Sequence, residues 1–198
     1  MKKLLVPAIA VMLSGAAFAQ NAEDLKNTWE MTIPVKTAQS TTLDKLFTAW
    51  ADVNPGDFVT IYKKYKKTPA ENIDGYQVNY KPKNGYMKIM EEVQFDNILE
   101  TCFWNLPNGN KLLGIYITQC HECGNCGEDE DAECHNAMMF YEFETAKNRL
   151  TPRADIAKKV MDQVGKGYPS LPCEGRDIEY YDPKSGSYKK VKWNGNGF

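Results

Sequence analysis

The sequence predicts an α+β domain: an antiparallel β-sheet built from several hairpins, with two or three helices covering it. Three observations lead to this fold class. Asn-Gly pairs stand between alternating aromatic runs, which is typical of tight hairpins. Other short segments place apolar residues every three or four positions, which indicates amphipathic helices. Most of the strand-like runs lack a long crossover between them, and this favours antiparallel pairing.

The first element we expect is a cleaved export signal over residues 1–19. Two lysines precede the apolar run Leu4–Leu13, and Ala17-Phe18-Ala19 has the small-residue pattern of a cleavage site. The apolar run is shorter than the roughly 20 residues that a membrane-spanning helix needs. We therefore expect one mature α+β domain over residues 20–198 that is periplasmic or secreted and has no membrane span.

Composition is consistent with such a domain. The 198-residue chain is 42% hydrophobic and 12% aromatic, which excludes a disordered protein. Its formal net charge is -2, and loss of the signal lysines makes the mature domain more acidic. A mildly acidic protein has no general attraction for nucleic acid or anionic lipid, so we expect neither as a partner.

Two helices are expected after a short strand that ends at Pro34. Asn54-Pro55-Gly56 ends the first helix, and Asn54 with Pro55 suits the cap and first position of the second. The first helix carries five apolar residues on one face: Leu43, Leu46, Phe47, Trp50 and Val53. The second turns its lysines outward and four larger residues inward: Phe58, Ile61, Tyr62 and Tyr65.

Four hairpins and a third helix complete the expected elements. The first two hairpins turn at Asn84-Gly85 and Asn108-Gly109, the third covers residues 138–152, and the fourth turns between Asp182 and Gly186. Between the last two, a helix is expected to begin at Pro152 and to end at a Gly165 cap. Its apolar face contains Ile156, Ala157, Val160, Met161 and Val164.

The segment Cys120–His135 contains four of the six cysteines and both histidines. Thiols of an exported protein are mostly paired in disulfides, whereas thiols in a reducing compartment are free to bind metals. An even number of cysteines in an exported chain allows complete pairing, although the sequence does not choose the connectivity. The disulfide candidates are Cys102, Cys120, Cys123, Cys126, Cys134 and Cys173.

A metal site or a thiol-redox pair in the same segment is the alternative interpretation. Tetrahedral zinc accepts mixed cysteine and histidine ligands, although a second pair with two-residue spacing is missing. A C-x-x-C motif after a strand also occurs in redox proteins, but no helical pattern follows it. We expect no cofactor, with zinc as the alternative. The metal-ligand candidates are Cys120, Cys123, Cys126, Cys134 and His135.

The sequence favours a binding or structural module over an enzyme. It contains neither a G-x-S-x-G nor an H-E-x-x-H motif, and both histidines lie within the cysteine segment. The last hairpin combines aromatic residues with lysines, a mixture that can recognise sugars or peptides. We expect an extracytoplasmic protein or glycan ligand; the alternative is a metal-binding or thiol-redox protein centred on residues 120–135. The ligand-binding candidates are Tyr181, Tyr188, Lys190, Lys192 and Trp193.

Overall fold

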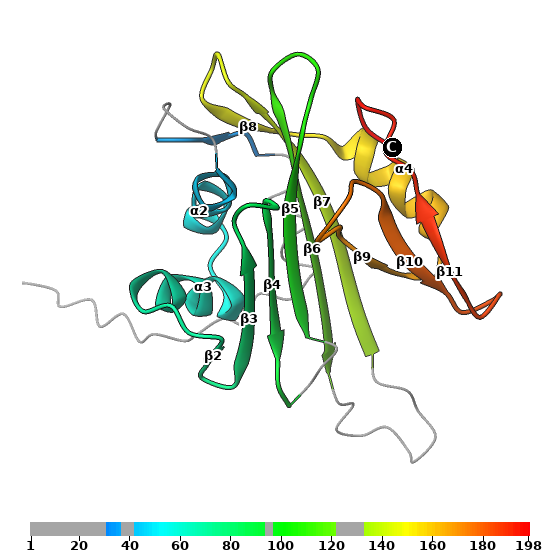
Figure 1. The fold of residues 1–198 in the computed structure, drawn as a ribbon, viewed down its shortest axis with the longest axis horizontal. Coiled ribbons are helices and arrows are strands. Elements are labelled where there is room, and N and C mark those ends of the chain that lie inside the picture. Colours follow the sequence, from blue (N-terminus) through cyan, green and yellow to red (C-terminus); the bar gives the residue numbers. More distant parts are fainter. Residues whose placement is uncertain (1–30, 37–41, 94–96, 122–132) are drawn as a thin grey trace, which may run out of the picture.

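A computed structural model of the chain describes residues 31–36, 42–93, 97–121 and 133–198 (Figure 1). The expected export signal and most of the cysteine segment lie outside these residues. The side chains of residues 121 and 133–135 are likewise outside the described part. No helix among the described residues has the length and apolar character needed to cross a membrane.

The fold is α+β and is built around an eight-stranded antiparallel sheet with the order β1-β8-β7-β6-β5-β4-β3-β2. Neighbours from β2 to β8 follow one another in the chain, so the sheet is a meander. Its strands are β1 (Ile33–Pro34), β2 (Asn72–Ile73), β3 (Tyr76–Lys81), β4 (Tyr86–Glu91), β5 (Ile98–Asn105), β6 (Lys111–His121), β7 (Glu133–Glu144) and β8 (Arg149–Pro152). A second, three-stranded sheet has the order β11-β10-β9 and contains β9 (Tyr168–Ser170), β10 (Ile178–Asp182) and β11 (Ser187–Val191).

All four expected hairpins are present. The turns depend on residues that accept a left-handed backbone: Gly85 has φ +64° and Gly109 has φ +81°. At Gly85 a side chain would also have no room, because an added Cβ would lie 2.6 Å from the Phe103 ring. Glycine therefore fixes both the turn and the close packing of the β3–β4 hairpin on β5.

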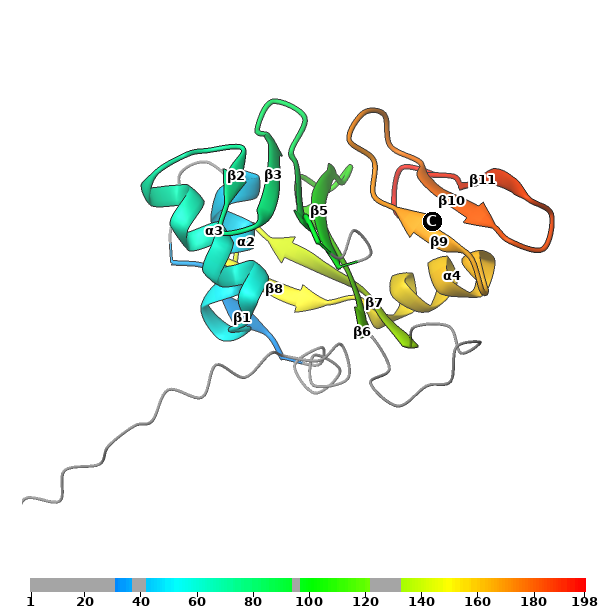
Figure 2. The same cartoon turned by 90° about the horizontal axis from the view of Figure 1, so that it is seen from below.

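Helices α2 (Leu43–Val53) and α3 (Asp57–Lys67) cover one face of the large sheet (Figures 1 and 2). The expected inward faces are largely confirmed, except that Val53 at the end of α2 is exposed. The expected start of α3 at Pro55 is wrong, since the helix begins at Asp57. Asn54 ends α2 instead, and its Nδ2 donates a hydrogen bond to the Trp50 carbonyl at 2.8 Å.

Helix α4 (Ala154–Val164) and the three-stranded sheet cover the opposite face (Figure 2). Pro152 belongs to β8, so α4 begins two residues later than expected. A second core forms here from side chains of both sheets and α4, including Trp104, Leu112, Phe140, Val160 and Ile178. Because the large sheet is buried on both faces, β6 has a nearly continuous apolar run rather than strict alternation.

Candidate ligand-binding face

The two faces of the three-stranded sheet have different environments. One face carries Ile178 and Val191, which are fully buried in the second core. The opposite face carries residues that alternate with these along the strands. The register places Tyr168 of β9 opposite Tyr181 of β10, and Tyr181 opposite Tyr188 of β11. A row of three tyrosines therefore crosses all three strands on the outer face.

These tyrosines are unusually accessible. Tyr168 is 59% exposed and Tyr188 is 79% exposed, whereas Tyr181 between them is half-buried. The rings of Tyr181 and Tyr188 contact each other with centroids 5.4 Å apart and planes at 62°. Large aromatic side chains usually lose most of their exposed surface on folding, so their accumulation on one face suggests contact with a ligand.

A polar row lies beside the tyrosines. Ser170 pairs with Glu179, and Glu179 pairs with Lys190, so all three share the outer face. Lys190 Nζ and Glu179 Oε1 form an ion pair at 2.8 Å. We call the six outward residues of the two rows the tyrosine face: Tyr168, Ser170, Glu179, Tyr181, Tyr188 and Lys190.

The structure brings together three of the five candidate ligand-binding residues: Tyr181, Tyr188 and Lys190. Lys192 is exposed just beyond the end of β11. Trp193 has a different environment, because its ring stacks on Trp104 with centroids 5.6 Å apart in the second core. Trp193 is therefore partly buried against the second core and lies apart from the tyrosine face. Tyr168 was missed because β9 is only three residues long and no hairpin pattern connects it to β10.

A hollow of about 450 Å³ adjoins the tyrosine face, a volume within the range of small-molecule sites. Three residues of the polar row, Ser170, Glu179 and Lys190, line it, together with Tyr86 and Lys81 of the large sheet. Its remaining wall is the segment between β9 and β10. Six charged residues line the hollow, three of each sign: Lys81, Arg176, Lys190, Glu174, Asp177 and Glu179.

A buried carboxylate anchors this region to the large sheet. Glu100 of β5 is 2% exposed and accepts hydrogen bonds from the Tyr86 hydroxyl (3.2 Å), the Ser170 hydroxyl (3.1 Å) and the Leu171 backbone N–H (2.6 Å). Lys88 Nζ lies 3.5 Å from the same carboxylate. Burial and the nearby Glu100 charge raise the pKa of Tyr86, so its phenol stays protonated and donates. Glu100 thus positions one edge of the tyrosine face.

Two of the six disulfide candidates, Cys102 and Cys173, have free thiols in this structure. Cys102 is buried beside Glu100, and its burial raises the pKa of the thiol well above the usual range. Cys173 lies on the wall of the hollow. Lys81 also lines the hollow, and its interaction with Cys173 raises the pKa of the ammonium. Neither thiol is therefore available as a staple for the cysteine segment in this structure.

The cysteine segment is the connection between β6 and β7. The register places Cys120 directly opposite Cys134 on these two strands. Cys120 is not one of the free thiols and has an interaction partner. Cys123 and Cys126, and the side chains of Cys134 and His135, lie outside the described residues. Within the part of the chain that the structure describes, three or more potential metal ligands do not gather at any point.

A larger hollow of about 600 Å³ lies elsewhere, beside β3 and the end of α3. It is open and is lined by Tyr65 and Tyr80, among other residues. These two rings are half-buried and pack against each other edge-to-face, with centroids 5.8 Å apart. Because Tyr65 and Tyr80 are both partly buried against the first core, whereas Tyr168 and Tyr188 are exposed, this hollow is a weaker candidate than the tyrosine face.

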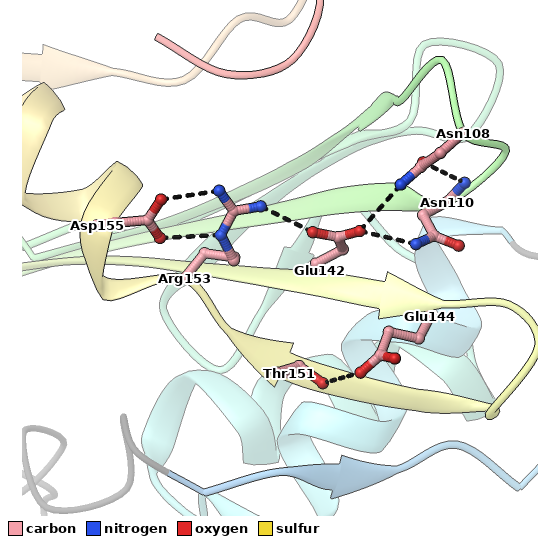
Figure 3. A network of polar contacts seen from close by, with 7 residues as sticks. All are labelled: Asn108, Asn110, Glu142, Glu144, Thr151, Arg153 and Asp155. Carbon is pink, nitrogen blue, oxygen red and sulfur yellow. Dashed lines mark hydrogen bonds and ion pairs between the residues drawn. The ribbon is translucent and has the colours of Figure 1, made fainter.

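A polar network beside the β5–β6 turn and the start of α4 has a structural role (Figure 3). Arg153, at the start of α4, donates to Glu142 of β7 at 2.7 Å and to both oxygens of Asp155. Glu142 also accepts hydrogen bonds from Asn108 and Asn110 of the β5–β6 turn. Burial alone would raise the pKa of Glu142, but these donors outweigh it and lower the pKa. The network joins a turn, a strand and a helix start.

Glu144 of the same region should make the protein sensitive to acid. Hydrogen bonds from Lys147, Thr151 and Arg149 lower the pKa of Glu144 to about 2. A carboxylate with a lowered folded-state pKa stabilises the fold above its unfolded pKa, near 4.3, and loses this contribution as pH falls toward 2. We expect Glu144→Gln to flatten the loss of stability between about pH 5 and pH 2. Urea midpoints of both proteins at several pH values measure this, and parallel pH profiles would contradict it.

A scan against protein-family models finds no matching family, and searches of curated proteins and of solved structures find no significant match.

Proposed function

We propose that the protein is an exported binding module whose binding surface is the tyrosine face. The observation that supports this most strongly is the row Tyr168, Tyr181 and Tyr188, which crosses one sheet and exposes two of its three rings. Tyrosine offers a large contact area with few rotatable bonds, so little entropy is lost when it is ordered against a ligand. The phenol hydroxyl adds a hydrogen-bonding group to the apolar ring.

The strands that carry the tyrosine face are held in place by hydrogen bonds and core packing, which favours binding by a preformed surface. Glu100 connects the strand β9 and the following Leu171 to the large sheet through direct hydrogen bonds. On the other side, Ile178 and Val191 anchor β10 and β11 in the second core. A surface held in this way loses little freedom on binding, which is an advantage for affinity.

We also propose that the protein works in an oxidising compartment and that Cys120 is disulfide-bonded to Cys134. Directly opposed residues of antiparallel strands have Cα atoms about 4.5–5.5 Å apart, which is within the roughly 4.4–6.8 Å that a disulfide spans. Non-reducing peptide mapping of protein from the periplasm should recover the two cysteines in one linked peptide. Alkylation of both, with a stoichiometric metal in the native mass, would instead support the zinc alternative.

The binding role is tested with the double variant Tyr168→Ala/Tyr188→Ala. Wild-type protein is applied to arrays of glycans and of synthetic peptides, and we expect the variant to lose at least about tenfold in affinity for whatever is bound. Val93→Ala is the matched control, since Val93 is also highly exposed but lies away from the face, after β4.

The double variant is expected to fold normally, because both rings contribute little buried area. Its thermal midpoint should therefore remain close to that of the wild type. Equal binding by the wild type and a correctly folded double variant would refute the tyrosine face as the binding surface.

A further inference from the structure

We infer that the ligand of the tyrosine face is an uncharged oligosaccharide that lies across the tyrosine row and reaches into the adjoining hollow. This inference rests on the proposed function and specifies its ligand class. Three features of the described residues support it: the balance of charge, the chemistry of the tyrosine row, and the nature of the neighbouring sheet edge.

The charges of the site compensate each other. Lys190, the one lysine in the tyrosine face, is paired with Glu179 at 2.8 Å. On the same hairpin, Lys189 is paired with Asp182 at 2.5 Å. The hollow itself is lined by three cationic and three acidic side chains. An anionic polymer would be repelled by the three carboxylates of the hollow, and a cationic polymer would be repelled by its three positive side chains. Neither kind of polymer therefore gains a net electrostatic attraction.

The row of tyrosines suits a sugar chain chemically. A pyranose has an apolar face of C–H groups and a rim of hydroxyls, so it can stack on an aromatic ring while its rim remains hydrogen-bonded. Tyr168, Tyr181 and Tyr188 belong to three successive strands, and strands lie about 4.8 Å apart. The three tyrosines therefore follow one another across the sheet, and the rings of Tyr181 and Tyr188 are in contact.

The hollow adds charged hydrogen-bonding groups to the phenol hydroxyls of the tyrosine row. Its charged side chains include a guanidinium, Arg176, and the carboxylates of Glu174 and Asp177. Carboxylates accept hydrogen bonds from hydroxyls, whereas guanidinium groups donate to them. A neutral polyol can use both kinds of group, because each of its hydroxyls is both donor and acceptor.

An extended peptide is less well suited to this surface. Peptides that bind β-sheets usually add as a strand to an exposed edge. The three-stranded sheet has two edge strands: β9, which is only three residues long, and β11, which carries Lys189 and Lys190. A very short edge strand offers few backbone groups for pairing. Lysines on an edge strand discourage the addition of another strand. The accessible surface is consequently the face of the sheet, which offers side chains rather than backbone groups.

The test is isothermal titration of the full mature chain with neutral hexasaccharides of glucose, mannose, xylose and N-acetylglucosamine. Heparin and polygalacturonate serve as anionic probes, and the peptide array described above supplies peptides. We expect at least one neutral hexasaccharide to bind, with an affinity that changes less than about twofold between low and high salt, since no net charge is neutralised.

Two single variants separate the contribution of the Tyr188 ring from that of its hydroxyl group. Tyr188→Ala should weaken hexasaccharide binding by about tenfold, whereas Tyr188→Phe, which keeps the ring, should remain within about threefold of the wild type. Equal losses in both variants would overturn the stacking argument.

The other outcomes distinguish this inference from the function it rests on. Binding of only anionic polymers or peptides, lost in the Tyr168→Ala/Tyr188→Ala variant, would overturn the oligosaccharide and leave the binding face intact. Oligosaccharide binding that the double variant does not change would overturn both. A lack of binding to every neutral hexasaccharide would overturn the inference as well.

Discussion

Replacing Glu100 with alanine is expected to lower the free energy of unfolding by about 3–5 kcal/mol. Glu100 is 2% exposed, and its carboxylate accepts hydrogen bonds from a phenol, a hydroxyl and a backbone N–H. Alanine would leave the donors of Tyr86 and Leu171 buried without an acceptor. It would also leave Lys88, which is largely covered, without its counter-ion.

Glu100→Gln provides a more conservative comparison. It keeps the shape of the side chain but removes the charge, and one carboxylate oxygen becomes an NH₂ group that cannot accept from Leu171. We expect a loss smaller than that of the alanine variant but still above about 1 kcal/mol. Glu179→Gln is the control, because its ion pair with Lys190 is exposed and should contribute less than about 1 kcal/mol.

Urea denaturation followed by tryptophan fluorescence measures all three variants. The expected order of destabilisation is Glu100→Ala, then Glu100→Gln, then Glu179→Gln. If Glu100→Ala proved no more destabilising than Glu179→Gln, the buried carboxylate would not be the anchor between the two sheets.

Trp104→Ala should be comparably destabilising, by about 3–5 kcal/mol. The indole is 4% exposed and stacks on Trp193, with ring contacts to Phe140 and Phe198. Its Nε1–H also donates to the Arg176 carbonyl at 2.8 Å, in the segment that forms the wall of the hollow. The substitution therefore creates a cavity and removes the hydrogen bond to the Arg176 carbonyl at the same time.

Trp104→Phe separates these two contributions. It retains an aromatic ring but loses the hydrogen bond to Arg176, so we expect a smaller loss of about 1–3 kcal/mol. Hydrogen exchange should show faster opening of β10 and β11 in both variants relative to α2 and α3. Uniform acceleration across the whole chain, or a loss below about 1 kcal/mol for Trp104→Ala, would contradict the proposed role of this indole.

The fold class and most local elements could be predicted from the sequence. Helix α2 and the turns at Gly85 and Gly109 depend on short-range patterns of apolar residues and glycine, which the sequence displays directly. The start of α3 was missed because Asn54 caps the end of α2 through Trp50 instead of opening the next helix. An asparagine can occupy either the end of one helix or the cap of the next, so only tertiary packing decides between the two positions.

The candidate site was only partly predictable. The alternation of Tyr181, Tyr188 and Lys190 is visible in the last hairpin, but Tyr168 joins them only through the pairing of β9 with β10. Trp193 was grouped with these residues by the composition of the hairpin, but strand alternation places position 193 on the face of Val191, opposite Tyr188 and Lys190. The role of Glu100 depends on partners about 70 residues away, Ser170 and Leu171, which no local pattern connects to it.

An NMR titration with ¹³C-labelled tyrosine rings tests the tyrosine face most directly. The hexasaccharide that binds most tightly is added to the protein, and the chemical shifts of the assigned tyrosines are followed. We expect the signals of Tyr168, Tyr181 and Tyr188 to shift together and to saturate with the same Kd. Shifts centred on Tyr65 and Tyr80, beside the larger hollow at β3, would place the binding surface elsewhere and contradict the account.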